Sequence, residues 1–224
     1  ESKVSAYIDG ATVESINGNI FIDAQTAGEM IAIAAGGAFS GKVAVDGSVV
    51  IGLLNNEVLA FAEDGAELNA AGSVGISAAD TISAVLVAGV AGGAESAAVG
   101  VSNSTFVSHN EVLAYTGSNV FVKGKGKKAV VKTLGADLVT PGNWKEINHR
   151  GVFVNAVSDH AVRIFAAGGL GAGTVAVAAS GTVSVINDTI KAFIGETSTV
   201  EASNDDSEDD LSKPNNATTN PYNP

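Results

Sequence analysis

The chain has 224 residues and no cysteine, so it can bury a sizeable core but cannot form a disulfide scaffold or a thiolate metal site. Its net charge of −12 argues against a general nucleic-acid binder, because such proteins neutralise phosphates with lysine and arginine. Aromatic residues make up only 5% of the sequence and glycine numbers 27, which favours closely approaching backbones such as those of a tightly wound coil.

Stretches of alternating apolar and polar or small residues predict β-strands along most of the chain. In chain order they include residues 19–24, 42–46, 73–77, 151–155 and 175–185. Turn-forming residues occur among them: Asn17-Gly18, Asp46-Gly47, Asp64-Gly65 and Pro141-Gly142-Asn143. No amphipathic helix of 12 or more residues stands out, so the chain is predicted to be all-β.

The longest uncharged run, residues 164–187, is long enough to span a bilayer as a helix. Its many glycine, alanine and serine residues weaken that reading. Its valines stand at alternate positions, which is the period of a strand. We therefore predict no transmembrane segment.

One short phrase recurs along the chain and indicates a repeat architecture. It occupies residues 55–61, 109–115 and 187–193, and a clipped copy occupies residues 4–8. The alanines that anchor the first copies, Ala6, Ala60 and Ala114, are evenly spaced (60 minus 6 and 114 minus 60 are both 54), whereas Ala192 follows at a wider interval (192 minus 114 is 78). A fixed period is typical of stacked units that cannot bury their apolar faces alone.

These spacings predict a right-handed parallel β-helix, or β-solenoid, over residues 1–202. The last interval is longer by 24 residues (78 minus 54), as though one extra coil had been inserted. Coils of roughly 24 to 27 residues would then give two coils per repeat and roughly eight coils in all.

Equivalent residues of a repeat lie above one another in a stacked coil, so the phrase predicts three ladders. They are an apolar interior ladder of Val58, Val112 and Ile190, an aromatic ladder of Phe61, Tyr115 and Phe193, and a polar set at a turn, formed by Asn55, His109 and Asn187 or by their neighbours Asn56, Asn110 and Asp188. Stacked amides at such a turn can form hydrogen bonds along the rod.

Two segments depart from the repeat. Residues 120–165 form an irregular basic expansion that holds eight of the twelve basic residues and the single tryptophan, Trp144. Residues 203–224 are acidic and then rich in Asn and Pro, which predicts a linker or a poorly packed tail. The acidic residues 205–210 could hold calcium, but they lack the EF-hand spacing, so we interpret them as a solvated tail.

Motifs that could carry chemistry are weak. Residues 36–43 approach a phosphate-binding P-loop, but Val43 stands where that loop needs Ser or Thr to hold magnesium. His109, His149 and His160 lack metal-ligand spacing and an accompanying nucleophile motif, so we interpret them as exposed loop residues. Sugar-cleaving enzymes also use β-helices, but they need paired carboxylates beside a cleft. We predict no enzyme activity, catalytic residue, cofactor or metal.

The basic expansion carries the strongest binding signal. Lysines at positions 123, 125 and 127 would project from one face of a strand. With their neighbours they form a possible contact for sulfated or sialylated glycans or another receptor: Lys123, Lys125, Lys127, Lys128 and Lys132. The alternative, which we favour, is a solvated outer face whose charge prevents lateral aggregation.

The repeat resembles a known family in residues 6–11, in residues 192–197 and in the valine-rich run 171–177. These units resemble the passenger repeats of large bacterial filamentous adhesins, especially the leukotoxin-type exoproteins of fusobacteria. The resemblance covers residues 1 to about 202.

This resemblance implies a fragment of a long exoprotein, secreted or held at the cell surface after export through an outer-membrane pore by an autotransporter or two-partner route. The function it implies is adhesion to host cells as a β-helical rod. A segment of a cytotoxin that acts on leukocytes is the first alternative, and a polysaccharide-active enzyme is the second.

Overall fold

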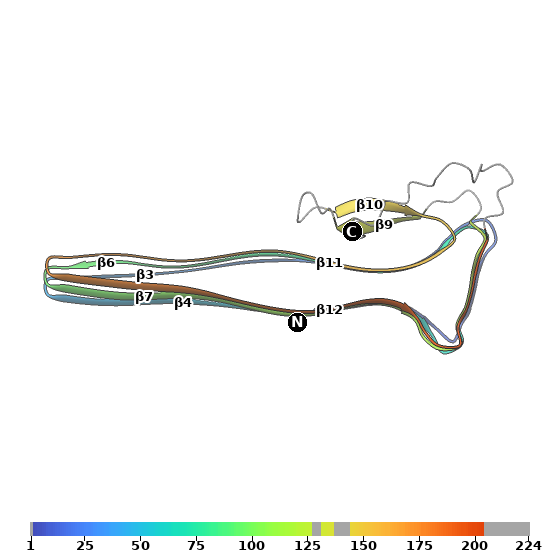
Figure 1. Cartoon of the computed structure of the whole chain (residues 1–224), viewed down its shortest axis with the longest axis horizontal. Coiled ribbons are helices and arrows are strands. Elements are labelled where there is room, and N and C mark those ends of the chain that lie inside the picture. The colour runs from blue at the N-terminus through green and yellow to red at the C-terminus, as the bar shows by residue number, and fades with distance from the viewer. Residues whose placement is uncertain (1, 127–130, 137–143, 204–224) are drawn as a thin grey trace, which may run out of the picture.

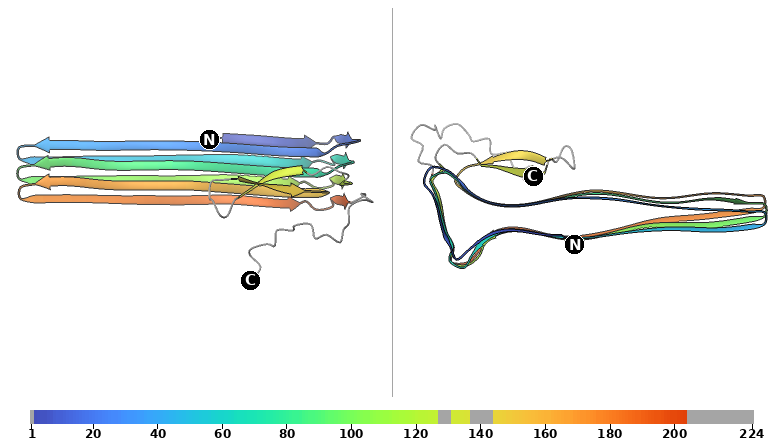
Figure 2. Two further views of the ribbon diagram at one scale, coloured as in Figure 1. Left: turned by 90° about the horizontal axis from the view of Figure 1, so that it is seen from above. Right: turned by 180° about the vertical axis from the view of Figure 1, so that it is seen from behind.

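The computed structural model of the chain describes residues 2–126, 131–136 and 144–203, and every regular element among them is a β-strand. The strands form a flattened parallel β-helix, seen along its axis in Figure 1 and from the side in the left panel of Figure 2. The coil winds to the right, as parallel crossovers almost always do. The predicted fold class is therefore confirmed.

Each coil has two long sides and one short side, and each side belongs to one sheet. The β7 sheet contains β1 (Ser2–Asp9), β4 (Val43–Glu63), β7 (Ala97–Thr116) and β12 (Val175–Ile194). The β6 sheet contains β3 (Ile20–Ser40), β6 (Val74–Ala94) and β11 (Val152–Ala172). The short sheet contains β2 (Thr12–Ser15), β5 (Glu67–Ala70), β8 (Phe121–Gly124) and β13 (Thr199–Ala202).

Strand register fixes the length of one coil. Val58 pairs with Val4 on one side and with Val112 on the other, so register partners in these strands of the β7 sheet are one repeat apart. One 54-residue repeat therefore makes one coil, and the prediction of two smaller coils per repeat, and of roughly eight coils, is wrong. The reason is strand length: β3 and β4 each have 21 residues, whereas strands usually have about 5 or 6.

The 24 additional residues do not form an extra coil. The expectation that one coil had been inserted in the longer interval is therefore wrong. They lie between Gly126, whose N–H donates to the carbonyl of Gly72, and Gly151, which sits one position further along the coil. The described part of this insertion is an antiparallel pair, β9 (Val131–Ala136) and β10 (Trp144–His149), placed outside the coil (Figure 1).

Two glycines mark the points where the chain leaves and rejoins the coil. Gly126 has φ +67° and Gly151 has φ +78°, a backbone region that other residues rarely adopt. The coil resumes with Val152 paired to Val74, at the wider sequence separation of 78. The same stacking therefore continues above the insertion.

The interior is divided into two apolar clusters. The wide end, where the short sheet separates the long sheets, holds a cluster that includes Val58, Leu68, Ile76 and Val112. The second cluster lies between the long sheets and is centred on Ile82, Leu86 and Phe106. Toward the tip the inward positions become small, as at Ala88, Ala98 and Ser102, which lets the two sheets lie close together.

Two of the three predicted ladders are confirmed. Val4, Val58, Val112 and Ile190 are in register along the β7 sheet, with Val58 and Val112 fully buried and Ile190, on the last strand of that sheet, 44% exposed. On the outer surface the rings of Tyr7, Phe61, Tyr115 and Phe193 stack with centroids 5.0–5.2 Å apart. Both ladders follow from in-register stacking of identical coils.

The polar set does not lie at a turn. Asn55, His109 and Asn187 lie within the long strands β4, β7 and β12 and face outward, whereas Asn56, Asn110 and Asp188 face the interior. The turn expectation is wrong because the strands run through the phrase.

The aromatic ladder makes a testable prediction about Tyr115. Burial, and then the hydrogen bond and negative charge of Glu63, raise the pKa of the Tyr115 phenol to about 12. We expect phenolate absorbance from Tyr115 only near that pH, and a lower pKa in Glu63→Gln. The measurement is a pH-jump absorbance titration read before alkaline unfolding, with Tyr115→Phe identifying the transition. A Tyr115 transition near the ordinary value of 10 would contradict the stacked arrangement.

Candidate functional site

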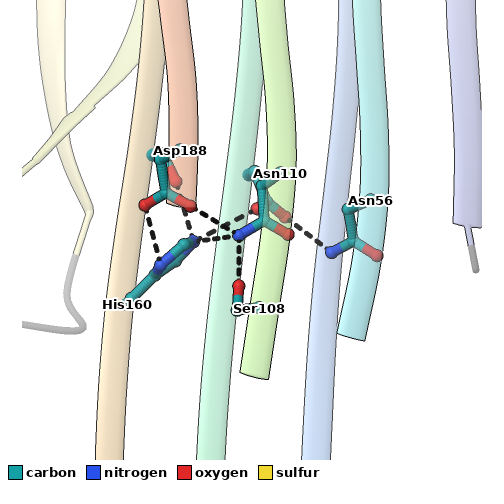
Figure 3. Close-up of polar contacts among 7 residues, drawn as sticks. Asn56, Ser108, Asn110, His160 and Asp188 are labelled. Carbon is teal, nitrogen blue, oxygen red and sulfur yellow. Dashed lines mark hydrogen bonds and ion pairs between the residues drawn. The ribbon is translucent and has the colours of Figure 1, made fainter. Parts of the chain in front are cut away.

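A band of polar side chains lies between the two apolar clusters. Its members come from five strands of the two long sheets (Figure 3). They are Asn56, Asp80, Ser108, Asn110, Ser158, His160 and Asp188, here called the waist band.

Strand alternation places these residues inside. On β6 the inward positions run Ala78, Asp80 and Ile82, so a single carboxylate interrupts an apolar row. The same interruption occurs on β4, where Asn56 precedes Val58. Because side chains alternate at a period of two, each strand contributes a polar group to the same level of the coil.

His160 connects the two sheets. Its Nδ1 lies 3.2 Å from Oδ2 of Asp188, and its Nε2 lies 3.4 Å from Oδ2 of Asp80. The Asp80 side chain is completely buried, and those of His160 and Asp188 are 9% and 22% exposed. A buried carboxylate is costly without hydrogen-bond donors, so the imidazole is central to the band.

Amide groups supply the remaining donors. Asn56 donates through Nδ2 to Oδ1 of Asp80 at 3.3 Å, and Asn110 donates through Nδ2 to Oδ1 of Asp188 at 2.8 Å. Asn110 is also within 2.6 Å of Ser108 Oγ, while its own Oδ1 is buried without a hydrogen-bond partner. The band is thus a cross-sheet network with one unsatisfied acceptor.

The contacts of Ser158 invite comparison with a catalytic triad. Its Oγ lies 2.9 Å from Nε2 of His160, whose Nδ1 faces Asp188, which is the order of a Ser–His–Asp relay. A triad needs its nucleophile beside a substrate pocket. Ser158 instead faces the interior. It lines neither the surface hollow formed by residues 63–64, 115–118 and 193–196 nor the hollow at the tip near Phe39. We interpret the band as structural.

The predicted lysine contact is only partly assembled. Lys123 lies on the outer side of β8, with its Nζ 2.5 Å from Oε2 of Glu201 on the next strand of the short sheet. Lys125 is two positions further on, and Lys132 is exposed on β9 of the insertion. Lys127 and Lys128 lie outside the described residues. Because Glu201 compensates one charge, the proposed contact depends more on the insertion than on Lys123.

The three histidines were expected in exposed loops, and the structure corrects this for all three. His160 is in the waist band, and His109 lies on the outer face of β7. His149 lies on β10, stacked on the Phe153 ring at 4.3 Å, with Nε2 2.7 Å from Thr133 Oγ1. Sequence reasoning named Asn56, Asn110 and Asp188 as a possible stacked polar set, but it placed them at a turn. It missed Asp80, Ser158 and His160, although polar residues at the inward positions of otherwise apolar strands are a signal for them.

No family model, curated protein or solved structure compared with this chain matches it. Across the described ranges, no helix is long and apolar enough to cross a membrane. The same residues contain no group of three or more His, Asp or Glu side chains arranged to hold a metal ion.

The waist band predicts a large difference between two histidines on long strands. His160→Ala leaves Asp80 and Asp188 without their shared partner, so we expect a loss of about 2–4 kcal/mol in the free energy of unfolding. His109→Ala, on the outer face of β7, should change it by less than about 0.5 kcal/mol. Urea unfolding followed by circular dichroism measures both. Equal effects of the two substitutions would show that the band does not stabilise the fold.

The burial of His149 predicts that the insertion packs against the coil in a pH-dependent manner. Burial lowers the pKa of its imidazole from 6.5, so the unfolded or detached form binds the proton more readily. The free energy that His149 contributes to docking of the insertion is therefore fully present above pH 6.5 and declines as the pH falls below that value.

We expect faster amide exchange in β9 and β10 below this pH, while β6 and β7 keep their protection. Hydrogen exchange with mass spectrometry measures it. His149→Phe, which retains an aromatic ring against Phe153, should remove the pH dependence. Its persistence in that variant would rule out His149 as the cause.

Proposed function

We propose that this chain is a non-enzymatic rod segment of a large bacterial surface or secreted exoprotein, and that it acts in adhesion to host cells. The observation that carries the proposal is the insertion at residues 127–150, which leaves a coil that otherwise repeats in register. In repeat proteins, insertions form loops on one face, and that face is often the binding face.

Charge supports a role in binding for the insertion. Residues 127–150 contain five basic and two acidic residues, in a chain whose net charge is −12. A local positive field in an acidic protein attracts anionic partners in a manner that depends on ionic strength. Sulfated or sialylated host glycans fit this chemistry. Lys132 of β9 and Lys125 beside the insertion are the residues of the described part of the chain that would contact them.

The coil itself suits a rod. Each added coil lengthens the stack by about 4.8 Å while using the same strand pairing, so the shape can be extended by repetition. Secretion through an outer-membrane pore and location at the cell surface belong to this proposal and rest on the resemblance to adhesin passengers. The absence of cysteine is compatible with export in an unfolded state.

A cytotoxin segment is the second candidate, favoured by one observation. The outer side of β4, β7 and β12 carries exposed apolar residues, including Val45, Ile51 and Leu53. A surface of this kind can contact lipid or another protein. Lysis of leukocytes separates this candidate from adhesion.

The decisive variant deletes residues 127–150, joining Gly126 directly to Gly151. The same two coil positions are consecutive one coil earlier, at Gly72 and Ser73, so the coil should close without strain. We expect an unchanged circular dichroism spectrum and at least tenfold weaker attachment to epithelial cells and leukocytes. Attachment is measured with labelled protein at low and physiological salt, with lysis scored in parallel.

Point variants provide a matched comparison. Lys125→Glu with Lys132→Glu should weaken attachment, whereas Lys42→Glu at the tip turn changes the charge elsewhere and should not. Attachment that survives the deletion would refute the insertion as the contact. Lysis by the purified chain would favour the cytotoxin reading instead.

A further inference from the structure

One outer surface of the coil is both flat and apolar. It is formed by the outward side chains of β4, β7 and β12 at residues 43–53, 97–107 and 175–185, here called the arm face. Val45 is 72% exposed, Leu53 is 67% exposed and Val99, on the central strand, is 40% exposed. Side chains that large are rarely left exposed in such numbers on one side of a soluble domain unless they meet a partner.

The composition of the arm face is uniform. Parallel register places Val45, Val99 and Val177 in one row and Ile51, Thr105 and Val183 in another. Twelve of the eighteen outward positions are Val, Ile or Leu, and none is charged. The opposite outer face, on β3, β6 and β11, also exposes apolar side chains such as Ile33, but it carries the charged residues Glu29 and Arg163 in the same region.

We propose that the arm face binds the arm face of a second copy of this chain, so that the two copies pack sheet against sheet about a two-fold axis. β-Branched side chains on a pleated surface interdigitate well with a similar surface, as in β-sandwiches. An uncharged face also meets its own copy without like-charge repulsion, as a two-fold contact requires.

The available area is close to the smallest that specific interfaces bury. Eleven residues at about 3.3 Å each and three strands about 4.8 Å apart give roughly 500 Å² on each copy. The pair would bury roughly 1,000 Å², the lower limit for a specific interface.

The chemistry favours a protein sheet over a lipid surface. Proteins that lie at a bilayer surface use tryptophan or tyrosine at the headgroups and lysine or arginine toward anionic lipids. The arm face has none of these residues at its outward positions. A valine-rich pleated surface has the shape of another sheet.

The test is sedimentation velocity of the full chain over a range of concentrations. We expect a monomer–dimer equilibrium, weakened at least tenfold by Val99→Glu, which places a charge at the centre of the arm face. Val87→Glu lies on the central strand of the opposite face and should leave the equilibrium unchanged. Mixing Val99→Glu with Val99→Lys should restore the dimer, because opposite charges then meet across the interface.

Further variants keep the outcome interpretable. Val45→Glu changes a more exposed residue of the arm face, on β4, which is paired on one side only at that position. It should weaken the dimer even if the change at Val99 disturbs folding. The variant lacking residues 127–150 retains the arm face and should dimerise like the parent chain, which makes this inference independent of the proposed function.

Three results would overturn the proposal. The first is a monomer at every concentration, whether or not that monomer binds neutral phosphatidylcholine vesicles. The second is equal weakening by Val99→Glu and Val87→Glu. The third is open-ended growth unaffected by either change, which would indicate pairing through strand edges rather than faces.

Discussion

In-register parallel pairing between strands one coil apart is the constraint on which the rest of the molecule depends. It places side chains at equivalent positions of the repeat above one another, so a favourable contact in one coil recurs in the next. The aromatic ladder at Tyr7, Phe61, Tyr115 and Phe193 is a direct consequence. The same constraint makes errors cumulative, because a slip by one residue would turn every inward side chain outward.

The waist band opposes a slip in register within the long strands. A two-sided sheet of small and β-branched residues has weak register, since one alanine or valine packs much like the next. Asn56 bonds to Asp80, and Asn110 to His160, across the two sheets. The inward neighbours of Asp80 on its own strand, Ala78 and Ile82, cannot make such a bond. Buried polar groups specify position at the cost of desolvation, and here they also separate the two apolar clusters.

The period of two in apolar residues and the constant spacing of the repeated phrase were sufficient to predict an all-strand parallel coil and two of its ladders. Coil size was not predictable, because alanine and glycine occupy both inward and outward positions along Ile20–Ser40. The apolar alternation therefore fades and gives no sign that one strand spans 21 residues. The waist band was visible as Asp80 and His160 at inward positions, but their partnership joins residues 80 positions apart and depends on the coil length. The insertion was recognised by its charge, and only the flanking hydrogen bonds at Gly126 and Gly151 show that it leaves the coil intact.

Coil length is the central claim, and introduced cysteine pairs test it directly because the chain contains no cysteine of its own. Ile51 and Thr105 are register partners, and so are Thr105 and Val183. Adjacent strands about 4.8 Å apart allow a disulfide, whereas positions two coils apart, at about 9.6 Å, do not. We predict that Ile51→Cys with Thr105→Cys, and Thr105→Cys with Val183→Cys, each oxidise to an intramolecular disulfide in the folded protein. Failure of both pairs to form it would contradict the 54-residue coil.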